Sequence, residues 1–109
     1  MVVTLSKDSI IHSYYLFHEA LALYEKLSGV KQGNSLTSGK FAKLAQVPGL
    51  TSDTLKKVDY DLIFKKALLV QNTGVMNFDI FVEGLFIITE RLRGEVTRAS
   101  FLGIVRNAL

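Results

Sequence analysis

Apolar side chains recur at three- and four-residue spacings along most of the chain, which is the spacing that puts side chains on one face of an α-helix. The clearest stretch, Asp59 to Leu92, predicts two helices joined by a tight loop that contains Gly74. Residues expected to reach a shared core are Leu62, Ile63, Phe64 and Ala67 in the first helix and Phe78, Phe81, Val82, Leu85, Ile88 and Leu92 in the second. A helix, a turn at glycine, a short extended piece and a second helix form the skeleton of an EF-hand.

A long helix is predicted before this stretch, from about Asp8 to Leu27, with Ser6 or Asp8 as its N-cap and Gly29 as its C-cap. Its apolar positions form a first stripe of Ile10, Tyr14, Phe17, Leu21 and Tyr24 and a second stripe of Leu16, Leu23 and Leu27. Apolar surface this wide predicts packing against more than one neighbouring element.

A short helix is predicted from Lys40 to Ala45, with Thr37 or Ser38 as its cap and Phe41 and Leu44 pointing inward. Residues 47–50 end it, because proline disfavours helix at the residue before it and glycine permits a turn. Residues 51–58 are expected to form a linking turn that is helical from Asp53 at the earliest.

The last helix is predicted from about Val96 to Ala108, after a stop at Gly94. Its expected inner face consists of Phe101, Leu102, Val105, Ala108 and Leu109. No strand longer than a few residues is visible, so the sequence predicts an all-α fold of about five helices in one domain, residues 1–109.

Two twelve-residue windows match the EF-hand loop in spacing but not in chemistry. The later window runs from Leu69 to Ile80 and has Met76 at the eighth position, which is apolar in an EF-hand loop. The earlier window runs from Gly29 to Lys40 and has Leu36 at the same position. The windows begin 40 residues apart, which predicts that Leu36 and Met76 lie opposite each other in a very short two-stranded ladder.

The oxygen ligands that calcium needs are missing from both windows. Positions one, three, five and twelve of the later window are Leu69, Gln71, Thr73 and Ile80, and positions three and twelve of the earlier one are Lys31 and Lys40. The sequence therefore predicts a paired, degenerate EF-hand-like core that binds no calcium. The alternative is that Gly74 marks an ordinary turn between two helices.

Composition narrows the function classes. The chain has 49% hydrophobic residues and one proline. It has no cysteine, and this absence excludes disulfides, thiol catalysis and cysteine-ligated zinc. It has no apolar window of membrane-spanning length and no secretion signal, so we expect a cytoplasmic protein that does not enter a membrane. Its net charge of +3 is mild and permits an acidic partner.

Side chains suited to catalysis are few and scattered. His12 and His18 are six residues apart on one predicted helix and point to different faces, while Asp59 and Asp61 stand where acids cap a helix start. No set of nucleophile, base and orienting residue is present, and no glycine-rich phosphate loop. We expect no enzymatic activity, no cofactor and no bound metal.

Three short motifs occur in a characteristic order. They are Lys40-Phe41-Ala42-Lys43-Leu44, Asp59-Tyr60-Asp61-Leu62-Ile63-Phe64, and Phe78-Asp79-Ile80-Phe81 leading into Leu85. With the last helix, residues 93–109, this order resembles the tubulin polymerization promoting protein family over nearly the whole chain. The resemblance implies a core of degenerate EF-hands that binds tubulin and stabilises or bundles microtubules. The expected location is the cytoskeleton, which includes that of a cilium or flagellum. The family's zinc binding is not implied, because the cysteines are absent.

Two surfaces are candidates for partner binding. The first consists of six lysines: Lys40, Lys43, Lys56, Lys57, Lys65 and Lys66. They form either one basic face that binds the acidic tails of tubulin or an ordinary solvated surface. Nucleic acid is a poorer partner, since only four arginines are present and no basic stripe is interleaved with aromatic residues. Phe86 and Ile87 are either covered by the last helix or form an apolar groove that docks a partner helix or a second copy of the chain. The alternative function is therefore an adaptor that docks a helix or self-associates.

Overall fold

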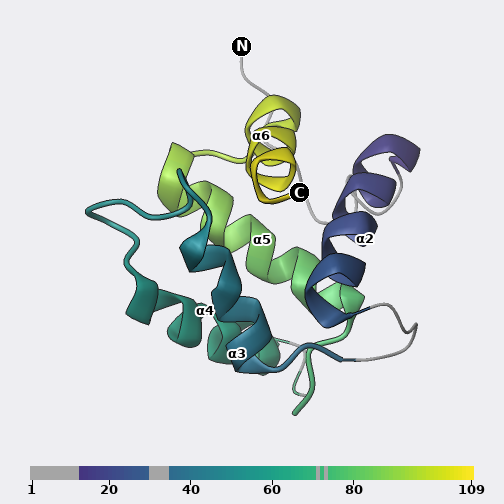
Figure 1. Ribbon diagram of the computed structural model, residues 1–109, viewed down its shortest axis with the longest axis vertical. Coiled ribbons are helices and arrows are strands. Elements are labelled where there is room, and N and C mark those ends of the chain that lie inside the picture. The colour runs from purple at the N-terminus through teal and green to yellow at the C-terminus, as the bar shows by residue number, and fades with distance from the viewer. Residues whose placement is uncertain (1–12, 30–34, 71, 73) are drawn as a thin grey trace.

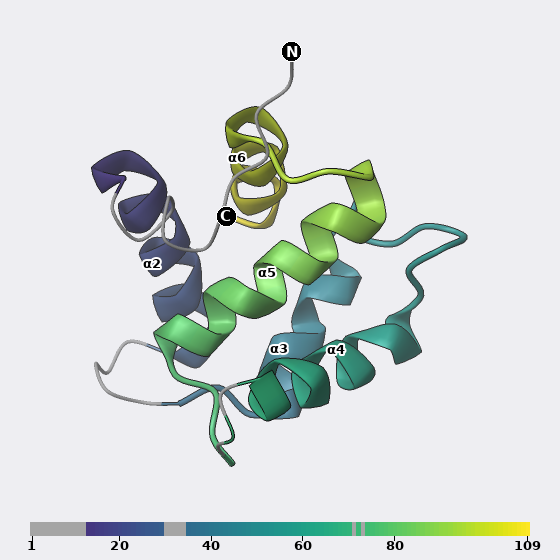
Figure 2. The same cartoon turned by 180° about the vertical axis from the view of Figure 1, so that it is seen from behind.

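The computed structural model describes residues 13–29, 35–70, 72 and 74–109, and the fold below refers to these residues. Its helices are α2 (Tyr14–Ser28), α3 (Ser38–Phe41), the 3₁₀ helix η1 (Ala42–Gln46), α4 (Lys57–Val70), α5 (Phe78–Arg93) and α6 (Arg98–Ala108). Helix α5 runs diagonally through the molecule, with α2 and α6 on one side and α3 and α4 on the other (Figure 1, Figure 2). The expectation of an all-α fold is confirmed for the described residues. None of their helices has the length and apolar character to span a membrane.

Helix ends follow local side-chain chemistry. Thr37 caps α3 as predicted, and its hydroxyl accepts the Lys40 N–H at 3.2 Å. Gly29 and Gly94 end α2 and α5 as predicted, and Gly94 has a left-handed backbone (φ 80°), which glycine adopts without a steric penalty. The proposed caps at Ser6 and Asp8 lie outside the described residues, and Ser13 is the N-cap of α2.

The middle of the chain differs from the prediction in its boundaries. The expected helix at residues 40–45 is one turn of α-helix followed by the 3₁₀ helix η1, with Phe41 and Leu44 buried as expected. Helix α4 begins at Lys57, within the segment 51–58 whose helix start the sequence left open, and α6 begins at Arg98, two residues after the predicted Val96. Before α6, the hydroxyls of Thr97 and Ser100 form a reciprocal capping box that stops the helix from starting earlier.

The core is centred on the ring of Phe41. This ring lies among Tyr60, Phe64 and Phe81, with ring centroids 6.0, 5.9 and 6.2 Å away. Gly84 on α5 faces the same ring, and a Cβ atom there would lie 3.0 Å from two of its carbon atoms. The close approach of the Phe41 ring to the α5 backbone therefore depends on the absence of a side chain at position 84.

The turn at residues 47–50 is held from two helices. The hydroxyl of buried Tyr60 on α4 donates to the Leu50 carbonyl, and Asn107 Nδ2 on α6 donates to the Pro48 carbonyl at 2.6 Å. Gly49 has a left-handed backbone (φ 87°) within this turn. These bonds connect α4 and α6 to the segment that ends η1.

Several predicted core positions are wrong. Tyr14, at the start of α2, is 81% exposed, whereas Leu16, Leu23 and Tyr24 of the two predicted stripes are buried as expected. Leu62 of α4 and Leu109 after α6 are also exposed. For Leu62 the reason is that α4 offers two apolar faces and the neighbouring helices cover only one, whereas Tyr14 and Leu109 lie at the ends of their helices. The predicted Ile10 lies outside the described residues.

Leu36 and Met76 pair in one antiparallel β-bridge, in which the Leu36 N–H donates to the Met76 carbonyl at 2.9 Å. Both side chains are buried. The contact is a single bridge, and the described residues contain no sheet. Lys31, Gln71 and Thr73 of the two predicted loops lie outside the described residues.

Candidate functional site

The six candidate lysines have different surroundings. Lys40 on α3 is half-buried, and its ammonium donates to the Ser28 carbonyl at the C-terminal end of α2, 3.1 Å away. This carbonyl is one of the acceptors that a helix end leaves without an intrahelical partner. Lys40 therefore connects α3 to α2.

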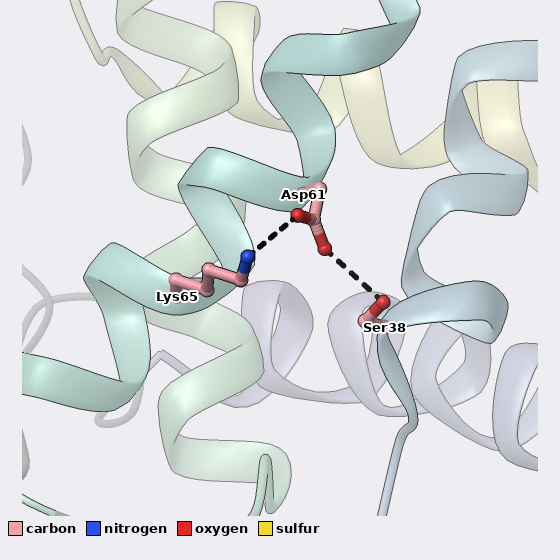
Figure 3. Close-up of polar contacts among 3 residues, drawn as sticks. All are labelled: Ser38, Asp61 and Lys65. Atoms are coloured by element: carbon pink, nitrogen blue, oxygen red, sulfur yellow. Dashed lines mark hydrogen bonds and ion pairs between the residues drawn. The ribbon is translucent and has the colours of Figure 1, made fainter.

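Lys65 is part of a three-residue polar contact between α3 and α4 (Figure 3). Its ammonium lies 3.0 Å from Asp61 Oδ2, and the Ser38 hydroxyl donates to Asp61 Oδ1 at 3.2 Å. The pKa of Asp61 is lowered, mainly by the hydrogen bond from Lys65 and also by the Lys65 charge and the hydrogen bond from Ser38. Desolvation of the carboxylate acts in the opposite direction. The contact holds Asp61 ionised and links α4 to the first turn of α3.

Lys43, Lys56 and Lys57 are exposed, and their side chains form no ion pair with any described residue. Lys43 lies on η1, which packs against α4, and Lys56 and Lys57 lie at the start of α4. The Asp59 carboxylate accepts the Lys56 backbone N–H at 2.7 Å and so caps this helix start, as expected for an acid at this position. The ammonium groups of these three lysines are thus available to a partner.

Phe86 and Ile87 line an open pocket between α4 and α5. Its volume is roughly 290 Å³, and its other walls are formed by Lys66, Val70, Glu83 and Glu90. Phe86 is also in contact with α6, since its ring centroid lies 6.1 Å from that of Phe101. Helix α6 therefore covers part of the predicted groove, and the remainder is an apolar floor between one lysine and two glutamates.

A second apolar surface was missed by the sequence analysis. Val58, Leu62 and Leu69 on α4 are exposed, and Val70 connects them to the pocket just described. The available signal was the composition of α4, in which apolar residues occur on every side of the helix. A helix of this kind at a protein surface presents one apolar face outward.

The contact between α2 and α6 is rich in charged groups. The guanidinium carbons of Arg98 and Arg106 lie 5.8 and 5.2 Å from the centroid of the Tyr15 ring, and Arg106 pairs with Glu19 at 3.2 Å. Lys26 Nζ donates to the carbonyls of Ala108 and Leu109, at 2.9 and 2.7 Å. These contacts join α6 to α2 and occupy most of the charged groups there.

The side chains considered for catalysis lie apart. His18 is exposed and packs against the rings of Tyr14 and Phe17, at 4.3 and 5.7 Å between centroids, while His12 lies outside the described residues. Among the described residues, no three His, Asp or Glu side chains are grouped as a metal site would require. Comparisons with protein-family models, with curated proteins and with solved structures find no match to this chain.

Proposed function

We propose that this chain is a calcium-independent, EF-hand-like module that binds tubulin. The observation that carries the proposal is that the three motifs on which the family resemblance rests meet at the ring of Phe41. Phe41 of the first motif contacts Tyr60 and Phe64 of the second and Phe81 of the third. All three motifs therefore contribute to one core, as the resemblance implies.

The pairing of two EF-hand-like units is supported by a repeat in local structure. Leu36 and Met76, at the eighth positions of the two windows, face each other in the β-bridge. The ninth positions are Thr37 and Asn77, and each caps the helix that follows. In both windows the cap accepts the backbone N–H of the twelfth position, at 3.2 Å from Lys40 and 3.1 Å from Ile80.

Calcium independence follows from the two twelfth positions, where an EF-hand supplies a bidentate glutamate. Lys40 there directs its ammonium to a carbonyl of α2, and Ile80 is buried in the core. Isothermal titration calorimetry with calcium should give no heat of binding. Micromolar affinity for calcium contradicts the degenerate-loop part of the proposal.

Tubulin binding is assigned to the exposed lysines around the start of α4. The flexible tails of tubulin are acidic, and ammonium groups without an internal partner attract them with a strong salt dependence. Lys43, Lys56 and Lys57 meet this condition, whereas Lys40 does not. We accordingly assign the protein to the cytoskeleton.

The test is cosedimentation with microtubules over a series of salt concentrations. Binding should weaken as salt rises and should fall in the double variant Lys56→Glu/Lys57→Glu. The matched control is Arg98→Glu/Arg106→Glu, which changes the net charge equally on α6, a helix that packs against α2 and α5. Absence of pelleting at low salt, or equal loss in both variants, contradicts the assigned surface.

A second candidate function, an adaptor, is favoured by the pocket at Phe86 and Ile87. Its apolar floor could receive a side chain from a partner helix or from a second copy of the chain. Ile87→Asp should then abolish capture of the partner or dissociate an oligomer seen by light scattering. A monomer whose binding to every partner is unchanged by Ile87→Asp contradicts this candidate.

A further inference from the structure

We draw no further inference here: the strongest candidate, the exposed apolar face of α4 that continues through Val70 into the pocket between α4 and α5, carries nothing, because nothing in the described part of the chain shows what covers it.

Discussion

The two faces of α4 carry similar residues and have opposite surroundings. On the inner face, Tyr60, Ile63 and Ala67 are fully buried against α3, η1 and α5, whereas Leu62 and Leu69 on the outer face are mostly exposed. Hydrophobicity alone therefore does not decide burial in this helix. What decides it is whether another part of the chain provides a surface of matching shape.

The largest expected difference between the two faces concerns Phe41 and Leu62. Phe41→Ala removes the ring on which the aromatic cluster converges and should lower the free energy of unfolding by about 3–5 kcal/mol. Leu62→Ala on the outer face should change it by no more than about 0.5 kcal/mol. Urea denaturation followed by circular dichroism measures both, and similar losses from the two variants would contradict the division into inner and outer faces.

Tyr60 tests the polar part of the inner face. Tyr60→Phe leaves the buried Leu50 carbonyl without its donor and should cost about 1–3 kcal/mol. Burial raises the pKa of the Tyr60 hydroxyl above its ordinary value, so the unfolded chain loses this proton first as pH rises. The wild-type protein should lose stability above about pH 10, and the loss should be smaller in Tyr60→Phe. Equal alkaline slopes in the two proteins contradict the assignment to Tyr60.

Two glycines distinguish a packed helix face from an open one. A methyl group at Gly84 would lie 3.0 Å from the Phe41 ring, which Tyr60 and Phe81 hold in place, so Gly84→Ala should destabilise the fold by about 1–3 kcal/mol. Nothing lies near the corresponding position of Gly103 on α6. Gly103→Ala should instead stabilise the protein by up to about 1 kcal/mol through its higher helix propensity. A stabilising Gly84→Ala would show that α3 and α5 pack less closely than described.

The smallest expected effect is at Asp61, on the border between the two faces. Its pKa is lowered in the folded protein, so its ionised form contributes stability above the unfolded pKa, and this contribution is lost as pH falls through the folded pKa. Asp61→Asn should lower the melting temperature slightly at neutral pH and by progressively less below about pH 4. A difference that does not change with pH would show that the carboxylate charge contributes nothing.

Much of the fold could be predicted from short stretches of sequence. The caps at Thr37, Gly29 and Gly94 depend on residues within one helical turn. The 40-residue spacing of two windows also predicted that Leu36 lies opposite Met76, but the predicted ladder is a single bridge. The candidate surfaces were less predictable. That Lys40 bonds to Ser28 and that the Ser38 hydroxyl donates to Asp61 depends on how α2, α3 and α4 meet.

The sequence by itself determined which regions are helical and several of the caps that bound them, because helix propensity, capping and turn formation act between residues at most about four positions apart. Only the tertiary structure decided which apolar face of α4 is buried, since this helix offers two. The burial of Tyr60 instead of Leu62 follows from helices that are distant in sequence and adjacent in space. The same packing leaves Val58, Leu62 and Leu69 exposed.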